Sequence, residues 1–338
     1  MKAYRLLPGG GVDGLQLGDE TQRPLGAHDV RVEVKAAALN YRDLRYAWGQ
    51  SANKPAHPIV PLADGIGVVM EAGAAVTRFS PGDRVITTFF PHWTEGAGSR
   101  ERVAVSYGTQ IDGTLAEELV THEDGLVRAP GGLDDLLAAT LTCSGVTAWN
   151  ALFVQGTAKP GETVVILGTG GVSVWALLLA VAAGLHVIIT SSSDEKLARA
   201  EALGARGLVN YRQTPEWEIE VLKLTSGRGA DVVLEVGGEN TLPRSIAAVR
   251  FGGTVVVIGG LSGFGGAKVE PGSLIGGAKR LVGISVGSRT MTEDLVRFVE
   301  VAGIKPVVDR TFSFAEAPRA YTHLQAGQAF GKVVVSMT

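Results

Sequence analysis

The chain is poor in cysteine and has no long apolar run. Cys143 is the one cysteine among 338 residues, which excludes an internal disulfide and a cysteine-rich zinc-binding lobe. The longest apolar run, residues 174–183, is far shorter than the roughly 20 residues that span a bilayer. Residues 1–8 are too short and too interrupted for a signal peptide. We therefore expect a soluble, intracellular, cytoplasmic protein that does not bind a membrane.

Charge is also scarce. Charged residues make up 19% of the chain and the net charge is −3, so there is no electrostatic reason to expect a nucleic acid as partner. Apolar residues make up 45%, which is typical of a globular protein. The length is sufficient for two domains, and the 46 glycines predict many tight turns.

The most informative segment is a glycine turn between a predicted strand and a predicted helix. Residues 164–167 are apolar and typical of a buried strand, and apolar residues then recur at helical spacing. Gly168 and Gly170 let the backbone turn sharply and approach a pyrophosphate, whose charge the helix N-terminus stabilises. Ser173 stands where the usual motif has its third glycine. Between a strand and a helix, this turn predicts a dinucleotide-binding site.

From this turn onward, strand and helix patterns alternate. The predicted strands are short and apolar: residues 164–167, 186–190, 208–210, 231–236, 254–258 and 281–286. The predicted helices separate the first five strands: residues 172–183, 194–203, 215–225 and 240–250. Short apolar strands suit a parallel sheet buried on both faces, so we predict an α/β, doubly wound fold for this part.

The first third of the chain has a different pattern. Val30, Val32 and Val34 alternate with charged residues, which predicts a half-exposed strand. Further short strands are predicted at residues 65–71, 84–87 and 118–121, and the tail adds residues 312–314 and 332–336. We therefore expect a mostly β domain, residues 1–123 and 288–338, with a cofactor domain, residues 124–287, inserted between its two parts.

Several motifs occur in an order that resembles a known family. They are the glycine turn and residues 38–44, 64–69, 81–85, 141–149 and 330–334. With these motifs the chain resembles the medium-chain dehydrogenase/reductase superfamily, on its zinc-less, quinone-oxidoreductase-like side, which includes zinc-type alcohol dehydrogenase-like proteins. The resemblance implies a GroES-like catalytic domain, a Rossmann domain with a doubly wound parallel sheet, a nicotinamide cofactor between them, and a homodimer or homotetramer.

The resemblance also indicates which metal ligands are missing. Zinc-dependent relatives use a cysteine, a His-Glu pair and a further cysteine or acidic residue, and these positions match Asn40, Ala63-Asp64 and Cys143. A catalytic zinc needs about three suitable protein ligands, which Asp64 and Cys143 alone do not supply. We therefore expect no zinc. Cys143 is then interpreted as a buried, small apolar residue beside the nicotinamide.

Without a metal, the resemblance favours the reduction of quinones or α,β-unsaturated carbonyl compounds. In such reactions the electrons move onto a carbonyl oxygen, which hydrogen-bond donors can stabilise. The resemblance places Asn40 near that oxygen, and Tyr41 or Tyr46 are further catalytic candidates. The structural alternatives are a cap or turn residue for Asn40 and ordinary packing for the two tyrosines. Arg42 and Asp43 are expected to form an ion pair or a solvated face.

The cofactor is predicted to be NADP(H) rather than NAD(H). No carboxylate follows the strand at residues 186–190, where NAD-specific domains place one. Ser191, Ser192 and Lys196 would suit a 2′-phosphate, and relatives use a tyrosine at the position of Tyr211 beside the adenosine. Ser192 and Glu195 also fit a helix capping box.

The remaining cofactor contacts are carried over from the resemblance. The full set of predicted cofactor-binding residues is Cys143, Thr147, Gly168, Thr169, Gly170, Gly171, Val172, Ser191, Ser192, Lys196, Tyr211, Gly259, Gly260, Leu261, Gly287, Ser288 and Lys332. For Lys332, a phosphate contact and a plain surface position stay open.

Together these observations predict a zinc-independent, NADPH-dependent oxidoreductase that transfers hydride to quinones or α,β-unsaturated carbonyl compounds. An NADP-dependent alcohol or carbonyl dehydrogenase and a non-catalytic NADPH-binding protein are the alternatives. The predicted edge strand near residues 280–286 favours a homo-oligomer, because pairing would cover an apolar sheet edge.

Overall fold

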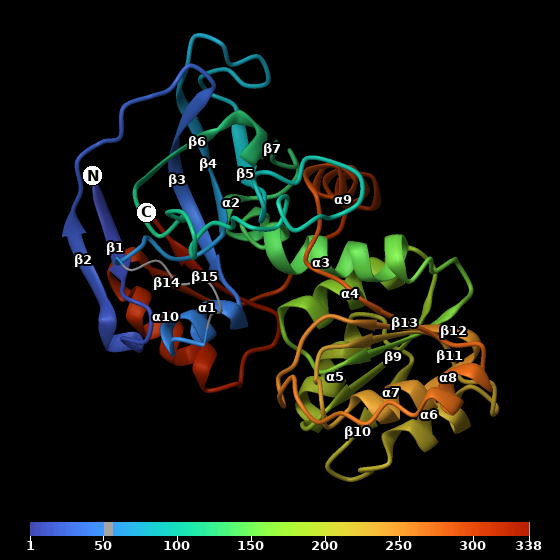
Figure 1. Cartoon of the computed structure of the whole chain (residues 1–338). Coiled ribbons are helices and arrows are strands. Elements are labelled where there is room, and N and C mark those ends of the chain that lie inside the picture. Colours follow the sequence, from blue (N-terminus) through green and yellow to red (C-terminus); the bar gives the residue numbers. More distant parts are fainter. Residues whose placement is uncertain (51–56, 338) are drawn as a thin grey trace. The chain divides into compact units, whose positions relative to one another are not determined.

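The computed structural model describes residues 1–50 and 57–337, and the chain divides into two compact units (Figure 1). The first unit comprises Met1–Val146 and Gly287–Thr338, and the second unit comprises Thr147–Val286. The second unit is therefore an insertion into the first, because the chain leaves the first unit at Val146 and returns to it at Gly287.

The second unit contains a six-stranded parallel sheet with the order β10-β9-β8-β11-β12-β13. Its strands are β8 (Thr163–Leu167), β9 (His186–Ser191), β10 (Gly207–Asn210), β11 (Ala230–Glu235), β12 (Val249–Val257) and β13 (Arg280–Gly283). In chain order this arrangement is 3-2-1-4-5-6, the order of the dinucleotide-binding doubly wound sheet. The central strand β8 is buried along its whole length, as expected for a strand covered on both faces.

Helices connect the parallel strands of the second unit. They are α4 (Gly171–Ala182), α5 (Asp194–Ala202), α6 (Trp217–Leu224), α7 (Leu242–Ala248) and α8 (Pro271–Ile275). Ahead of β8 lie α3 (Val146–Trp149) and η4 (Asn150–Gln155), which is a π-helical turn. The core of this unit combines strand residues such as Val165 and Val233 with Trp217 and Ile246 from the helices.

The first unit is built on a seven-stranded sheet with the order β14-β15-β3-β4-β5-β7, in which β6 also pairs with β3. The strands are β3 (Asp29–Leu39), β4 (Asp64–Ala72), β5 (Arg84–Thr87), β6 (Glu118–His122), β7 (Leu126–Arg128), β14 (Val308–Ser313) and β15 (Lys332–Ser336). A separate hairpin pairs β1 (Lys2–Leu6) with β2 (Leu15–Asp19). Pairing is antiparallel except between β14 and β15.

The helices of the first unit are mostly short. They are α1 (Tyr41–Ala47), α2 (Asp135–Ala138), the π-helical η3 (Leu141–Gly145), α9 (Arg289–Ala302) and α10 (Ala317–Gln325), with 3-10 turns η1 (Val12–Gly14), η2 (Glu123–Gly125) and η5 (Phe314–Glu316). Helices α1 and α10 contribute Leu44 and Tyr321 to a core that also contains Leu39 and Val333 of the sheet.

The predicted fold class is confirmed, with differences at some element ends. The predicted helix 240–250 ends at Ala248, and β12 already begins at Val249. Val249 pairs with Ala230 one step before the register of the two strands shifts, so the backbone is extended there although the sequence pattern is helical. The predicted strand 281–286 ends at Gly283.

The junction of the two units also differs from the expected position at residue 123. The structure assigns residues 124–146 to the first unit. The reason is that β7 pairs with β5 of the first sheet, so this segment is tied to the first unit before the chain enters the second. Among the helices described, none combines the length and the apolar character needed to cross a bilayer.

Candidate active site

A buried polar network lies at one end of three neighbouring strands of the first unit. Lys332 begins β15, Leu39 ends β3 and Asp64 begins β4. Val333 pairs with Leu39, and Ala38 pairs with Asp64. The antiparallel order β15-β3-β4 therefore brings three residues from distant parts of the chain to the same sheet end.

The Lys332 ammonium is the centre of this network. Its Nζ donates to Leu39 O at 2.7 Å, to Asn40 Oδ1 at 2.6 Å and to Asp64 Oδ2 at 3.0 Å. The side chains of Lys332 and Asp64 are 2% and 0% exposed. A surface position for Lys332 is therefore wrong, because the adjoining strand is apolar and carries the lysine into the sheet. All three acceptors of the ammonium belong to the first unit. We therefore do not propose that Lys332 binds a phosphate of the cofactor.

Asn40 joins this network to helix α1, whose N-cap it forms. Its backbone N–H donates to the Asp43 carboxylate at 2.7 Å, which closes the first turn of the helix. Its side-chain Oδ1 accepts from Lys332 Nζ and, at 3.1 Å, from Ser144 Oγ. The side-chain Nδ2 is buried and completes no hydrogen bond of normal geometry among the described residues, and the same holds for Asp64 Oδ1. The Asn40 side chain nevertheless acts on the Asp64 carboxylate and lowers its pKa. Asn40 is thus both a cap residue and a member of the network.

Burial changes the acidity of the groups around the network. It raises the pKa of Asp64, and the Lys332 ammonium opposes this rise. Burial also raises the pKa of Asp43 to about 6, against the lowering effect of Arg42. The Cys143 thiol has a pKa raised to about 12, again chiefly by burial. Cys143 is thus a buried, protonated thiol at neutral pH, and it is a poor nucleophile and a poor metal ligand in this state.

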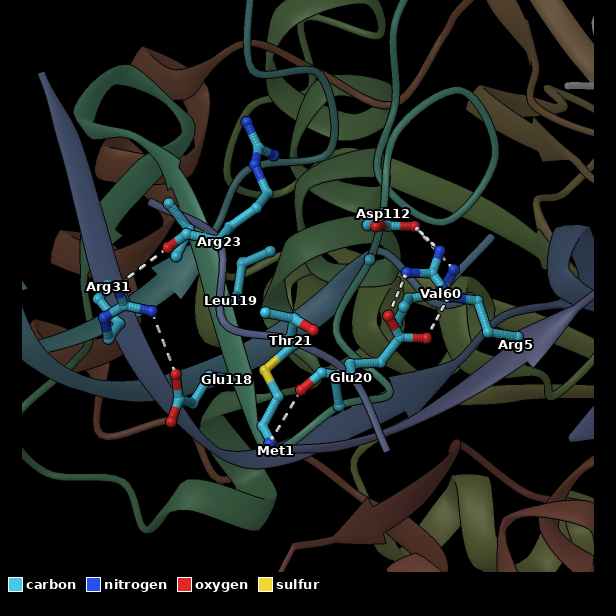
Figure 2. Close-up of a pocket in the computed structure, with 13 residues that line it drawn as sticks. Met1, Arg5, Glu20, Thr21, Arg23, Arg31, Val60, Asp112, Glu118 and Leu119 are labelled. Carbon is cyan, nitrogen blue, oxygen red and sulfur yellow. Dashed lines mark hydrogen bonds and ion pairs between the residues drawn. The ribbon is translucent and has the colours of Figure 1, made fainter. Parts of the chain in front are cut away.

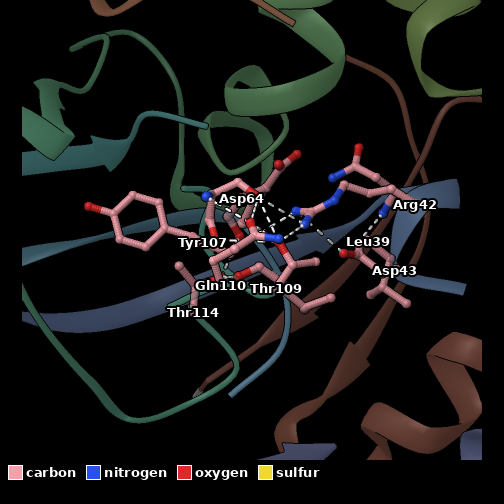
Figure 3. Close-up of polar contacts among 12 residues, drawn as sticks. Leu39, Arg42, Asp43, Asp64, Tyr107, Thr109, Gln110 and Thr114 are labelled. Atoms are coloured by element: carbon pink, nitrogen blue, oxygen red, sulfur yellow. Dashed lines mark hydrogen bonds and ion pairs between the residues drawn. The ribbon is translucent and has the colours of Figure 1, made fainter. Parts of the chain in front are cut away.

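Arg42 and the two tyrosine candidates have different environments. Arg42 donates to Tyr107 O at 2.9 Å and to Thr109 Oγ1 at 2.8 Å, and it lies 3.9 Å from Asp43 (Figure 3). The Tyr46 hydroxyl is buried without a hydrogen-bond partner among the described residues, and burial raises its pKa to about 12. Tyr41 is 41% exposed. Arg42 is thus a structural residue, and the two tyrosines differ in their access to solvent.

The donors of the network do not fit a zinc ion. Within residues 1–50 and 57–337 there is no group of three or more His, Cys, Asp or Glu side chains that could hold a metal ion. Asn40 and Asp64 already bind an ammonium, and a second cation at this place would face like-charge repulsion. We therefore derive no chemical step through a metal.

The glycine turn of the second unit has the geometry expected for a phosphate-binding loop. Gly168 has a φ of 73°, which a residue with a side chain rarely adopts. A Cβ added at Gly170, the N-cap of α4, would meet nothing within 4 Å, so the backbone is open to a ligand there. Ser173 Oγ donates to Leu167 O at 2.7 Å, and the residue in place of the third glycine thus closes the turn onto β8. Thr169 is buried, and Gly171 and Val172 form the first turn of α4.

Of the predicted 2′-phosphate residues, Ser191 ends β9, Ser192 follows it, and Lys196 lies in the first turn of α5. Asn210 pairs with Ser191, and Tyr211 N donates to Ser191 O at 3.1 Å. The cap of α5 is Ser193, whose Oγ accepts from Lys196 N at 3.3 Å. The predicted capping box of Ser192 and Glu195 is therefore wrong by one residue, which leaves Ser192 partly exposed without a capping role.

The other predicted cofactor residues are distributed over both units. Gly259, Gly260 and Leu261 follow β12, and Leu261 is 55% exposed. Thr147 is the first residue of the second unit and is buried. Gly287 and Ser288 belong to the first unit, where Ser288 caps α9 and its Oγ accepts from Met291 N. The structure therefore gives Ser288 a structural role.

Two features of the structure had no counterpart in the sequence analysis. One is the pair of Asp64 and Lys332. The other is Glu235 at the end of β11, which is fully buried and accepts from Gly237 N at 2.6 Å and from Thr241 Oγ1 at 2.7 Å. In both cases the sequence shows a charged residue at the end of an apolar strand, and this pattern could have indicated the buried contact. It indicates a buried partner, but it does not identify that partner.

The first unit contains a further pocket, whose walls include ion pairs between charged side chains. It is lined by residues that include Arg5, Glu20, Arg31, Asp112 and Glu118 (Figure 2). Arg5 pairs with Glu20 at 2.8 Å and with Asp112 at 2.7 Å, and Arg31 pairs with Glu118 at 3.3 Å. Because these charges neutralise one another, the pocket offers little net charge to a ligand.

Comparison with known proteins yields matches over both units. A family model described as alcohol dehydrogenase GroES-like domain matches residues 26–131, and one described as zinc-binding dehydrogenase matches residues 171–301. A zinc-type alcohol dehydrogenase-like protein of Schizosaccharomyces pombe is 40% identical over 323 residues, which cover 94% of this chain and 93% of that protein.

Solved structures are similar over the full length. A structure described as an NAD-dependent alcohol dehydrogenase has 33% identity and a TM-score of 0.91, and the match covers 100% of both chains. A crotonyl-CoA carboxylase/reductase in complex with NADP has 25% identity and a TM-score of 0.88, and the match covers 99% of this chain and 94% of the other. The similar structures therefore differ in the cofactor and in the reaction that their descriptions state.

Proposed function

Because this chain belongs to the medium-chain dehydrogenase/reductase superfamily and is an oxidoreductase of that superfamily, we propose that it transfers hydride from NADPH to quinones or α,β-unsaturated carbonyl compounds without a metal ion. The observation that carries this proposal is the Asn40 side chain. Its Oδ1 accepts from two donors, whereas its Nδ2 completes no hydrogen bond of normal geometry among the described residues. The Asp64 carboxylate, whose pKa the Asn40 side chain lowers, is the acceptor that acts on it in the protein alone. A buried donor without a well-formed hydrogen bond is costly and requires an explanation.

A carbonyl oxygen of the substrate would give Nδ2 a hydrogen bond of normal geometry. A nicotinamide cofactor supplies the hydride, which adds to the electron-poor carbon of the substrate, and negative charge develops on the carbonyl oxygen. An amide N–H that is already in place stabilises such a charge without reorganisation. Asn40 is 8% exposed, more than Asp64 or Lys332, although its Nδ2 atom is itself buried. Of the three residues it therefore lies nearest to solvent. The proton that completes the reduction is assigned to water.

The cofactor proposal rests on the second unit. The turn at Gly168 and Gly170 fits a pyrophosphate, and β9 ends in serines rather than in the carboxylate that would bind a ribose 2′-hydroxyl. The backbone link between Tyr211 and Ser191 supports a shared binding site at this sheet edge. We propose that Ser191, Ser192 and Lys196 bind the 2′-phosphate of NADP(H) and that Tyr211 lies beside the adenosine.

The decisive experiment is a substrate panel followed through NADPH oxidation. We expect turnover with an enone and a quinone, and much less with a saturated ketone, before and after incubation with a chelator. Asn40→Ala should lower kcat for the enone by roughly 10²- to 10³-fold, the usual effect of removing one such donor. Val301→Ala, at an exposed position of α9, is the control and should leave turnover unchanged.

The description of the similar NAD-dependent alcohol dehydrogenase favours a second candidate, an alcohol or carbonyl dehydrogenase. The same panel separates the two candidates. Turnover of a ketone and its alcohol, with no reduction of the enone, would replace the first proposal with the second. One equivalent of zinc per chain together with chelator-sensitive turnover would contradict the metal-free reaction. NADPH binding without turnover of any compound would indicate a non-catalytic binding protein.

A further inference from the structure

We propose that Lys332 is a positioning residue that fixes the orientation of the Asn40 amide and polarises it, so that the amide N–H becomes a stronger donor. This inference rests on the proposed function of Asn40 and assigns a role to a lysine buried in the first unit. It is carried by the geometry of the Lys332, Asn40 and Asp64 side chains.

The orientation of the Asn40 amide follows from its neighbours. A lysine ammonium has three hydrogens to donate and nothing to accept, so the atom 2.6 Å from Lys332 Nζ is the amide oxygen. In the reversed orientation, two donors would face each other at that distance. The Ser144 hydroxyl could adapt to either orientation, since a hydroxyl both donates and accepts. Lys332 therefore decides which way the amide faces.

The same contact polarises the amide. A hydrogen bond from a full positive charge is stronger than a neutral one, and linked hydrogen bonds strengthen one another where the surroundings are apolar. Lys332 draws electron density toward Asn40 Oδ1 and thereby makes the Nδ2 hydrogens more positive. The charge of the ammonium thus acts on a ligand through Asn40, although Lys332 itself has no hydrogen left to donate.

Asp64 keeps the ammonium in place. Its carboxylate lies 3.0 Å from Nζ and is fully buried, so the charges of the two side chains compensate each other. Leu39 O, at 2.7 Å, takes the third hydrogen of the ammonium. The lysine is therefore held by two contacts that do not involve Asn40, and its position does not depend on the ligand.

In the proposed reaction, hydride adds to the β carbon and the electrons of the C=C bond form an enolate. The enolate oxygen accepts the Asn40 N–H, and a proton from water then adds to the α carbon and restores the carbonyl. The contribution of Lys332 grows with the negative charge on that oxygen. It should therefore matter more for an enone than for a quinone, whose reduced form is a better stabilised anion.

The test compares the protein with and without the buried charge pair. The wild-type protein is the reference, and Asp64→Asn combined with Lys332→Met removes the lysine charge without leaving a buried carboxylate unpaired. Relative to the reference, we expect kcat for the enone to fall about tenfold to hundredfold in the double variant. This loss is smaller than the roughly 10²- to 10³-fold loss expected when the donor itself is removed. The quinone kcat should fall less, and the NADPH KM should not change.

A second readout does not require turnover. In cofactor-free protein with ¹⁵N-labelled asparagine, Asn40→Asp identifies the Asn40 side-chain signal by its loss. The Asn40 amide protons should resonate further downfield in the wild-type reference than in the double variant. Lys279→Gln removes a half-buried lysine charge in the second unit and should leave both the signal and the kinetics unchanged.

The outcomes separate this inference from the proposed function. Equal amide shifts and equal enone kcat values in the reference and the double variant would overturn the role of Lys332, even if the wild-type protein reduces enones. A wild-type protein that reduces no enone would overturn the proposed function, while the amide shifts would still show whether Lys332 polarises Asn40. An equal loss of enone and quinone turnover would show a merely structural role and overturn the inference.

Discussion

At the scale of single residues, Lys332 shows what a sequence reveals and what it conceals. The residue types of the network could be read from the sequence, and Asn40 was a predicted site residue. The partners of Lys332, however, lie 268 to 293 positions away along the chain. A lysine is usually exposed, and the pairing of β15 with β3 brings this lysine inside. The role of Asn40 as a site residue could thus be predicted from the sequence, whereas its contact with Lys332 could not.

Lys196 gives the most direct test of the cofactor prediction. An ammonium that binds a phosphate contributes about 1.5–3 kcal/mol, so Lys196→Ala should raise the Kd of NADPH by roughly one to two powers of ten. The Kd of NADH should change little, because NADH has no phosphate at that place. Titration by fluorescence measures both constants. Lys223→Ala, at an exposed lysine of α6 paired with Glu220, is the control, and equal weakening of both cofactors by Lys196→Ala would contradict the assignment.

At the scale of elements, the six strands of the second unit were predicted in the right places because each is short and apolar, although β12 begins five residues before its predicted start and β13 ends three residues before its predicted end. Helix ends were predicted less well. Caps depend on one hydrogen bond, and the sequence around α5 offers three consecutive serines. In the structure Ser193 is the N-cap, because its backbone is extended and its Oγ accepts a hydrogen bond from Lys196 N. The sequence pattern did not distinguish this serine from its neighbours.

The cap of α5 can be tested by stability. Ser193→Ala should lower the free energy of unfolding by about 1 kcal/mol, the usual effect of losing an N-cap side chain. Ser192→Ala should change it by less than about 0.5 kcal/mol, because no cap bond is lost. Urea denaturation of the cofactor-free protein gives both values. If Ser192→Ala had the larger effect, the cap would lie at Ser192, as the sequence pattern indicated.

Asp231 links three strands of the second sheet and predicts a pH dependence. It accepts from Thr163 N at 2.8 Å and pairs with Arg228 and Arg250. Burial favours its neutral form, but the hydrogen bond from Arg228, together with those from Thr163 and Arg250, dominates and holds the pKa at about 2. Since the folded-state pKa lies below the unfolded value of about 3.9, the stabilisation is full above pH 4 and is lost as the pH falls toward 2.

Asp231→Asn should therefore lower the free energy of unfolding by about 2 kcal/mol at pH 7. The difference from the wild-type protein should shrink between about pH 4 and pH 2, because the carboxyl of the wild-type protein becomes protonated there. Chemical denaturation at several pH values measures this difference. Asp294→Asn, which removes an exposed pair with Arg297, is the control. A difference that stays constant down to pH 2 would show that Asp231 acts through packing and not through its charge.

At the scale of the whole molecule, the fold class and the split of the first unit were predictable, since the two hydrophobic patterns differ clearly along the chain. The point at which the chain passes from one unit to the other was less predictable. Residues 124–146 contain the short strand β7, whose membership in the first unit depends on its pairing with β5. A three-residue strand is too short for its pattern of apolar and polar residues to indicate which strand it pairs with.

The edge of the second sheet leads to the last prediction, a homo-oligomer. Strand β13 pairs with β12 at the end of the strand order, and its Leu281 is 36% exposed. An apolar edge with unpaired backbone groups favours pairing with another chain, and a second copy can supply the same edge through two-fold symmetry. Light scattering at micromolar concentration should therefore give at least twice the chain mass of 35.2 kDa. Leu281→Arg should shift the mass toward the monomer, because a charge on the edge disfavours pairing. Val301→Arg, at a 90% exposed valine of α9 in the first unit, should not shift it. A monomer mass for the wild-type protein would contradict the prediction, and an oligomer unaffected by Leu281→Arg would show that a different surface holds the copies together.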